Sequence, residues 1–447
     1  MPRIAVGTVQ PDADHRLIVW GLTGALERLG IKVQSFCSQA HFAAQDASKS
    51  ITGQRQRHVD SWLMSPSTCR EIFWHGAQSS DLAIVEGSFS DPSGLTPSLG
   101  GRLDTLCSWL DLPQLAVIDA TKLDSCRLGT RPKKVCGILL DRVVDSNHAE
   151  QLRLTFETLW NVPVVGYLNE LHDVRRQIAS ISHDTIPSGS VLQQIGDRMC
   201  SQLDFEKLLR IAYQRAFPSI KPVLFQQADA TPRLKVALAF DEAFHCYFPD
   251  TLDLLEAYGA VIQDFSPLHG DRLPTDTDLV YFGCGRADRF AEQLAGNHCM
   301  KEALRSHVRR GGRVYAEGSG LAYLMERLKL PDGRQLSMSG LLPLEASFNP
   351  SSAAMRPVSA KLVRDNWLGR ISAKLRGYLN PNWQVSDSGA TTSARAANDR
   401  MMELVGRHQV VGSRLNVDFA AQPAFLQSFF NPVPLPRSPK TLCAPSF

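Results

Sequence analysis

Several side chains in the second half of the chain belong to residue types that bind metal ions or act as nucleophiles. His245, Cys246 and His269 are the most suggestive group, but the two histidines are 24 residues apart, which does not match a local zinc-ligand spacing. The ten cysteines of the chain include no Cys-x-x-Cys pair, which is the pattern of reduced thiols in a cytoplasm. We therefore expect no metal site, structural roles for both histidines, and buried apolar roles for Cys246 and Cys284.

A run of acidic and aromatic residues follows the apolar stretch 234–239. Asp241, Glu242, Phe244 and Tyr247 show no periodicity that a packed core would explain. In α/β sheets, ligands bind outside the carboxyl ends of the strands. We predict that these four residues contact a ligand or a neighbouring domain, and packing within their own domain is the weaker alternative.

Composition narrows the function classes. The net charge of the chain is +3, from 48 basic and 45 acidic residues, too small to indicate a nucleic-acid partner. Because no apolar run reaches ~18 residues, we expect no membrane span. The first residues also lack the apolar stretch of a signal peptide, so we expect a cytoplasmic protein.

Short apolar runs alternate with helix-length segments along most of the chain, as in strands buried on both faces of a parallel sheet. The Pro-rich segment 219–233 interrupts this pattern and predicts a linker, and 386–399 predicts a loop. We therefore predict two α/β domains, at 1–218 and 234–430, followed by a Pro-rich tail at 431–447. The expected strands and helices lie at 4–7, 17–29, 32–36, 81–87, 115–119, 135–140, 147–160, 162–166, 234–239, 249–258, 260–262, 279–283, 300–309 and 313–317.

Several longer sequence segments resemble those of a known protein family. They include Asp241–Asp250, with the sequence DEAFHCYFPD, Gly311–Glu317, and in the first domain Asp81–Gly87 and Gly137–Val143. In these strings, which run in order over nearly the whole chain, the sequence closely resembles the cobyrinic acid a,c-diamide synthase family, the glutamine-dependent amidoligases of cobalamin biosynthesis.

The resemblance implies a fold and two sites. The N-terminal domain would be a P-loop-like, dethiobiotin synthetase-like, doubly wound parallel sheet that binds ATP and Mg²⁺ to phosphorylate a carboxylate. The C-terminal domain would be a class I glutamine amidotransferase-like α/β domain. There, a cysteine on a strand-to-helix turn attacks glutamine and a histidine acts as the base.

The phosphate-binding loop departs from the family pattern. Gly7-Thr8 is retained, but the family's P-loop lysine falls on Asp14 or His15. Pro11 removes an N–H donor, and Asp12 and Asp14 place negative charge where phosphate would bind. The loop is thus a degenerate P-loop, and ATP and Mg²⁺, although implied by the family, are not expected in the usual pose.

The glutaminase residues depart as well. The family's Ala-Glu-Cys-Gly-Gly-Leu turn reads Ala316–Leu321 here, so Gly318 stands at the nucleophile position and Ser319 is one residue late. The family's Ser-Tyr-x-His-x-His string places Asn416 at the base position and Asp418 at the second histidine. Loss of a nucleophile or base alone costs on the order of 10⁶-fold in a comparable triad, so we expect no glutaminase activity.

Among the other positions that the resemblance singles out, some residues differ from the family pattern and one is retained. The loop that resembles the family's oxyanion-hole region reads Gly283-Cys284-Gly285, and we predict that Gly283 and Gly285 lie on the ligand or interdomain side. Asp141 replaces an asparagine that the family places near adenine. Glu86 is retained, and it fits equally well as a metal or substrate contact and as a strand-end cap.

Two functional hypotheses follow. The first is a divergent homologue without catalysis that binds a tetrapyrrole or another acidic small molecule, or that partners an active enzyme or a second copy of itself. The alternative is an active ATP-dependent corrinoid a,c-diamide synthase that uses free ammonia.

Overall fold

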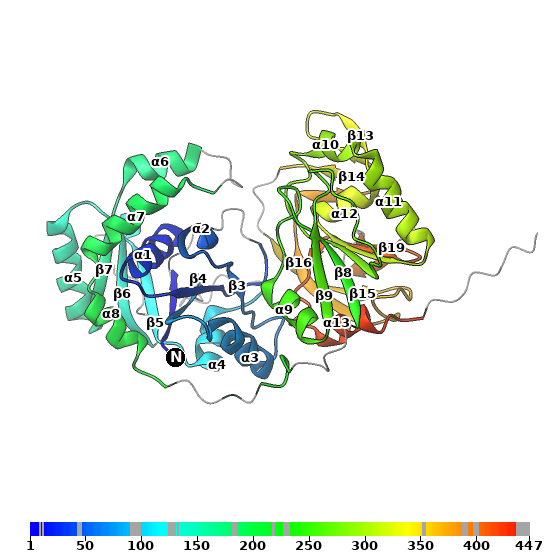
Figure 1. Ribbon diagram of the computed structural model, residues 1–447. Helices are drawn as coiled ribbons and strands as arrows, with labels where there is room; N and C mark the ends of the chain where they lie inside the picture. Colours follow the sequence, from blue (N-terminus) through cyan, green and yellow to red (C-terminus); the bar gives the residue numbers. More distant parts are fainter. Residues whose placement is uncertain are drawn as a thin grey trace, which may run out of the picture. The chain divides into compact units, whose positions relative to one another are not determined.

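In the computed structural model, the chain folds into two compact units (Figure 1). Unit 1 comprises Met1–Gln226 with Phe248–Asp250, and unit 2 comprises Gln227–Tyr247 with Thr251–Phe447. The first change of unit falls inside the segment 219–233, and most of the tail lies outside the described residues. The residues described are 1–8, 10, 13–42, 47–89, 100–123, 131, 134–180, 186–216, 220, 222–226, 233–350, 355–386, 392–396 and 402–434.

Unit 1 is built on a seven-stranded sheet with the order β3-β2-β4-β1-β5-β6-β7. All of its strand pairs are parallel, as the continuous apolar runs predict. The strands are β1 (Arg3–Thr8), β2 (Val33–Cys37), β3 (Arg57–His58), β4 (Leu82–Ser88), β5 (Gln114–Asp119), β6 (Val135–Val143) and β7 (Val164–Asn169).

Helices cover both faces of this sheet, which confirms the α/β class. In β6, Leu139 belongs to one apolar core, whereas Ile138 and Leu140 belong to another on the opposite face. Two helices of the first core approach closely, because a Cβ on Gly24 would lie 3.3 Å from the Cα of Gly196. The helices are α1 (Arg16–Arg28), α2 (Ser48–Thr52), α3 (Pro66–Ala77), α4 (Leu103–Leu110), α5 (Ser146–Trp160), α6 (His172–Ser180), α7 (Gly189–Gln202) and α8 (Phe205–Ala212).

Unit 2 contains a ten-stranded sheet with the order β21-β16-β15-β18-β19-β20-β11-β10-β8-β9. Its strands from β20 to β9 pair in parallel, and the others pair antiparallel. The strands are β8 (Leu234–Ala239), β9 (Ala260–Phe265), β10 (Leu279–Phe282), β11 (Arg313–Glu317), β15 (Arg356–Leu362), β16 (Lys374–Leu379), β18 (Thr392–Ala396), β19 (Met402–Arg407), β20 (Val410–Ser413) and β21 (Leu415–Asn416).

A second sheet and five helices complete unit 2 in the part of the chain that the structure describes. The sheet has the order β13-β12-β14-β17. Its strands are β12 (Met325–Lys329), β13 (Gln335–Ser337), β14 (Leu342–Phe348) and β17 (Trp383–Val385). The helices are α9 (Pro249–Ala257), whose first two residues belong to unit 1, α10 (Ala291–Gly296), α11 (His298–Arg309), α12 (Ser319–Leu324) and α13 (Pro423–Phe430).

One sequence expectation about unit 2 is wrong in part. The segment 386–399 was expected to be a loop, but β18 lies inside it and pairs with β15 and β19. A short Ser/Ala/Thr-rich strand carries little apolar periodicity, so the partners on both sides decide its conformation. No helix among the described residues is long and apolar enough to cross a bilayer.

Candidate functional site

A sharp turn joins β11 to α12 and lies at the carboxyl end of the parallel part of the sheet in unit 2. Gly318 forms this turn with φ 50° and ψ −110°, a conformation that residues with a Cβ rarely adopt. Its N–H donates to the carbonyl of Ser413 at 2.9 Å, which ties the turn to the neighbouring β20. The sequence therefore places a glycine at a strand-to-helix elbow, where the family resemblance places a nucleophile.

A thiol from another strand end occupies the space beside this glycine. A Cβ added to Gly318 would lie 2.9 Å from Sγ of Cys284, which follows β10 and is buried. The thiol donates to Oδ1 of Asn416 at 3.2 Å, and the backbone N–H of Ser319 donates to its sulfur. Cys284 thus lies against both Gly318 and Asn416.

The chemistry of this group is that of a neutral thiol. Burial raises the pKa of Cys284 well above its usual value, and the nearby Glu317 and Cys246 raise it further. Its partner Asn416 has an amide side chain, which cannot take up a proton. Ser319 does not replace it, because its buried hydroxyl has no hydrogen-bond partner that would act as a base.

Directly before the elbow, Glu317 holds a buried carboxyl group. Tyr315 and Tyr281 donate to its Oε1 at 3.0 and 3.3 Å, and the N–H of Val417 donates to its Oε2 at 3.3 Å. Burial raises the pKa of Glu317 to about 8, although these hydrogen bonds act in the opposite direction. At neutral pH this carboxyl is therefore largely protonated.

The second family histidine position, Asp418, is also buried. Its Oδ1 accepts from Oγ1 of Thr251 at 3.2 Å and from the N–H of Ala420 at 3.0 Å. These hydrogen bonds stabilise the turn that follows β21. They give the Asp418 carboxylate a structural role at this position.

The acidic–aromatic run after β8 is engaged within unit 2. Asp241 accepts from the N–H groups of Ala243 and Phe244 at 2.9 and 3.1 Å, and also from Oγ of Ser266 at 2.9 Å. Phe244 is fully buried in the apolar core. Glu242 is exposed, with its Oε2 3.6 Å from Nε2 of His269.

Tyr247 and two glycines connect the segment after β8 to the loop after β10. The Tyr247 hydroxyl donates to the carbonyl of Ala239 and accepts from the N–H of Gly283 at 2.9 Å. A Cβ on Gly283 would lie 2.5 Å from the carbonyl of Cys246, and a Cβ on Gly285 would meet the carbonyl of Ala243 at 2.2 Å. Close backbone packing thus explains both glycines, and the ligand or interdomain role of this region stays a prediction.

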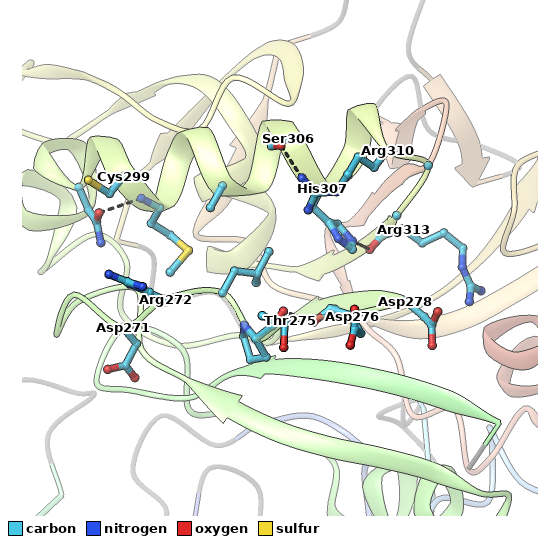
Figure 2. Close-up of a pocket in the computed structure, with 18 of the residues that line it drawn as sticks. Asp271, Arg272, Thr275, Asp276, Asp278, Cys299, Ser306, His307, Arg310 and Arg313 are labelled. Carbon is cyan, nitrogen blue, oxygen red and sulfur yellow. Dashed lines mark hydrogen bonds between the residues drawn. The ribbon is translucent and has the colours of Figure 1, made fainter. Parts of the chain in front are cut away.

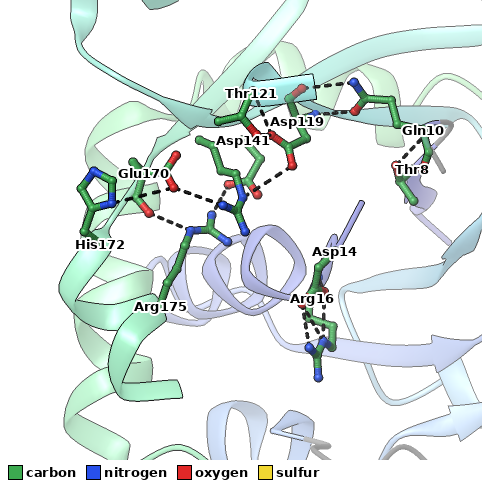
Figure 3. A network of polar contacts seen from close by, with 11 residues as sticks. Thr8, Gln10, Asp14, Arg16, Asp119, Thr121, Asp141, Glu170, His172 and Arg175 are labelled. Carbon is green, nitrogen blue, oxygen red and sulfur yellow. Dashed lines mark hydrogen bonds and ion pairs between the residues drawn. The ribbon is translucent and has the colours of Figure 1, made fainter. Parts of the chain in front are cut away.

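In unit 1, the side chain of Gln10 fills the space between the ends of β1 and β5. Its Nε2 donates to the carbonyl of Asp119 at 3.1 Å, and its Oε1 accepts from the N–H of Asp119 at 2.6 Å (Figure 3). Thr8 joins the same turn by accepting from the N–H of Gln10 at 3.1 Å. A Cβ on Gly7 would lie 2.6 Å from the carbonyl of Gly87, so the backbone packing at Gly7 leaves no room for a side chain.

The start of α1 carries an internal ion pair. The carboxylate of Asp14 accepts from the N–H of Arg16 at 2.9 Å and from its guanidinium at 2.6–3.0 Å (Figure 3). Burial raises the pKa of Asp14, but the hydrogen bonds and charge of Arg16 outweigh it and leave the pKa lowered. A protein carboxylate therefore occupies the helix end where a phosphate would bind. Pro11 and Asp12 lie outside the described residues.

Glu86, at the end of β4, contacts neighbouring side chains. Gln56 donates to its Oε1, and its Oε2 lies 3.9 Å from Nε2 of His15. The pKa of His15 is lowered mainly by burial. These contacts fit the strand-end role of Glu86 and leave the metal or substrate role as a prediction.

A charged network at the ends of β5, β6 and β7 was not anticipated from the sequence. Arg175 of α6 donates to Oδ1 of the buried Asp141 at 2.6 Å, and Arg142 donates to Glu170 at 3.1 Å (Figure 3). Nε of Arg142 lies 3.5 Å from Oδ2 of Asp119. Burial raises the pKa of Asp141 to about 6, against the opposing effect of Arg175.

ATP and Mg²⁺ do not fit the described residues of this sheet edge in the family's pose. Gln10 occupies the space beside β1, and Asp14 already accepts at the start of α1. No lysine stands among the described residues of the β1–α1 segment, and no group of three or more potential metal-ligating side chains is found in the described part of the chain.

If the Asp14 carboxylate keeps phosphate away, Asp14→Asn should admit it. Asparagine retains an oxygen for the N–H of Arg16 but removes the negative charge, which frees the guanidinium. We expect inorganic phosphate to bind several-fold more tightly to this variant than to the wild type. Phosphate titration followed by NMR shifts would measure the difference, and equal binding would contradict the blocking role of Asp14.

A pocket of about 930 Å³ lies elsewhere in unit 2, between α11 and the segment that joins β9 to β10 (Figure 2). Three of its ionisable groups serve the local structure. His307 contacts the carbonyl of Arg313 at 3.1 Å, Arg313 donates to the carbonyl of Phe429 at 2.7 Å, and Asp278 accepts from the N–H of Lys235 at 2.8 Å. We assign no ligand to this pocket.

Comparison with known proteins adds a family context. Residues 235–379 match the CobB/CobQ-like glutamine amidotransferase domain. A cobyrinate a,c-diamide synthase from Dehalococcoides mccartyi is 28% identical, with 96% of this chain and 97% of that protein covered. The protein of the same name from Salmonella typhimurium is 26% identical, with 92% of this chain and 93% of that protein covered.

Two solved structures are similar to part of the chain. The structure of PurLQS from Thermotoga maritima gives a TM-score of 0.35 at 15% identity, covering 45% of this chain and 98% of that chain. A glutamine amidotransferase from Methylobacillus flagellatus gives a TM-score of 0.29 at 14% identity, covering 44% and 76% respectively.

Proposed function

The chain is a divergent member of the cobyrinate a,c-diamide synthase family, and from this premise we propose that it is a member without glutaminase activity. In this proposal the protein binds a carboxylate-rich tetrapyrrole or another acidic small molecule, or assists an active partner enzyme. The fold of the family is retained, whereas its reactive positions hold other residues.

One observation carries the proposal. At the elbow, Gly318 has no side chain, and the adjacent thiol of Cys284 donates to the amide oxygen of Asn416 at 3.2 Å. A thioester requires a thiolate and a base to generate it. A buried neutral thiol facing an amide supplies neither, so glutamine would not be cleaved here.

The binding role has weaker support, which comes from unit 1. Its sheet edge holds Arg142 and Arg175, which project from the ends of β6 and from α6. Guanidinium groups are suited to bidentate recognition of carboxylates. Both are paired with protein carboxylates, so an acidic ligand would have to exchange with Glu170 or Asp141.

A second candidate function is an active a,c-diamide synthase that uses free ammonia. Its support is the retained Gly7-Thr8 turn and Glu86 at the neighbouring strand end. This function requires ATP to bind in a pose that avoids Gln10 and Asp14.

Glutaminase and nucleotide measurements separate the two candidates. We expect glutamine turnover of the wild type to equal that of Cys284→Ala, which removes the thiol at the elbow. We also expect no ATP binding in a calorimetric titration with Mg²⁺. Turnover that depends on Cys284 would contradict the loss of glutaminase activity, and micromolar ATP affinity would favour the ammonia-dependent ligase.

The ligand or partner can be sought directly. Native mass spectrometry and an absorption spectrum of the protein purified from its source would detect a coloured tetrapyrrole or a bound protein chain. A bound ligand or partner is the expected result. A bare monomer with no absorbance beyond that of the polypeptide would leave the binding proposal without support.

A further inference from the structure

Two cysteines face one another across a short antiparallel bridge beside the elbow. The N–H of Cys246 donates to the carbonyl of Cys284 at 3.0 Å, and the N–H of Cys284 donates back to the carbonyl of Cys246 at 3.2 Å. Residues that exchange both hydrogen bonds have Cα atoms about 5.5 Å apart and side chains on the same face. That spacing lies at the commonest Cα separation of disulfides, about 5.5–6 Å.

We propose that Cys246 and Cys284 form a reversible disulfide, a modification site that is independent of the proposed function. The backbone bridge holds the two Cα atoms at a separation suited to the bond, and the Cys284 side chain must leave Oδ1 of Asn416 to form it. Both cysteines are reduced in this structure.

Exposure gives the two thiols different roles. Cys246 is half-buried and can meet a small oxidant, whereas Cys284 is buried. With a low-molecular-weight disulfide as oxidant, the Cys246 thiolate attacks one sulfur and releases one small thiol. Cys284, whose raised pKa makes its thiolate rare, then attacks the mixed disulfide slowly and releases the second small thiol. Each protein thiol loses a proton, and the two electrons reduce the oxidant to two thiols.

The reaction would change the elbow. Formation of the bond withdraws the Cys284 sulfur from Oδ1 of Asn416 and from the N–H of Ser319. The space beside Gly318, which the sulfur fills in the reduced state, would then open. Oxidation of this pair is thus coupled to the packing around the elbow at Gly318.

The chain offers a direct test by peptide mapping. Cleavage after lysine and arginine separates residues 236–272, which contain Cys246, from residues 273–286, which contain Cys284. The full-length protein is treated with oxidised glutathione, its remaining thiols are alkylated, and it is digested without reduction. We expect the two peptides to appear joined by a disulfide, and a reductant to release them.

Two variants serve as controls. Cys246→Ser should leave Cys284 free and fully alkylated, and Cys284→Ser should leave Cys246 as a stable mixed disulfide with glutathione. The exposed Cys299 reports that the oxidant is active. The proposal is overturned if Cys299 reacts while the two peptides stay separate, whether Cys246 is then free or permanently joined to glutathione.

Discussion

Replacing Gly318 by alanine is expected to lower the free energy of unfolding of unit 2 by about 3 kcal/mol. Two causes add. The backbone at φ 50° and ψ −110° is strained for a residue with a Cβ, which costs about 1–3 kcal/mol. The new Cβ would also lie 2.9 Å from Sγ of Cys284 in a buried site, and such overpacking costs about 1–3 kcal/mol.

A double-mutant cycle separates these causes. Cys284→Ala removes the sulfur and leaves its Cβ at an ordinary 3.7 Å from the new one, so the double variant should recover the overpacking part. Gly333→Ala is the matched control, since φ there is 86° and nothing lies within 4 Å of an added Cβ. Calorimetry of the full chains would give the energies. Strict additivity of Gly318→Ala and Cys284→Ala would refute the contact between the two positions.

The parallel parts of both sheets are predictable from the sequence, because buried parallel strands leave continuous apolar runs. The run at 4–7 lies within β1, 115–119 lies within β5, and 313–317 coincides with β11. The helix expected at 17–29 is α1, offset by one residue, and Gly30 follows it with φ 76°. The antiparallel half of unit 2 leaves weaker signals, since strands such as β15 and β16 mix buried and exposed residues.

At the candidate site, the sequence motifs indicate which residues occupy the family's positions, but they do not predict which side chains contact one another. Gly318 and Asn416 could be placed from their strings, and in the structure both lie beside Cys284. Cys284 was expected to be buried, which is confirmed, but its meeting with Gly318 depends on the parallel pairing of β10 and β11. A signal was present in the sequence: the resemblance implies a cysteine at the position of Gly318, and Cys284 stands in the loop that resembles the family's oxyanion-hole region.

The charged network of unit 1 had no such signal. Arg175 and Asp141 are separated by a helix and a strand, and neither belongs to a motif that predicts their ion pair. Asp14, in contrast, was expected to place negative charge at the start of α1, and its partner Arg16 lies only two residues away. Local pairs of this kind can be predicted from spacing, whereas pairs between elements require the fold.

The second large effect expected is on the pH dependence of stability, and it involves Glu317. The pKa of its carboxyl is about 8 in the folded chain and near 4.5 when exposed, because burial disfavours the charged form. Between these two pH values the unfolded state binds fewer protons at this group than the folded state does. The contribution of Glu317 to stability therefore falls as pH rises from about 4.5 to about 8.

Glu317→Gln should remove this dependence, because glutamine does not titrate. Each unit of pKa shift corresponds to about 1.4 kcal/mol, so the variant should gain several kcal/mol relative to the wild type across this range. In either orientation of the amide, its NH2 group replaces an oxygen that accepts a hydrogen bond here, from Val417 or from the two tyrosines, and this mismatch offsets the gain by about 1 kcal/mol at every pH. The slope, rather than the absolute stability, is thus the informative quantity. Calorimetric unfolding of both proteins from pH 5 to pH 8 would measure it. Parallel stability curves would mean that Glu317 is already ionised in the folded chain, with Tyr281 and Tyr315 holding a carboxylate rather than an acid.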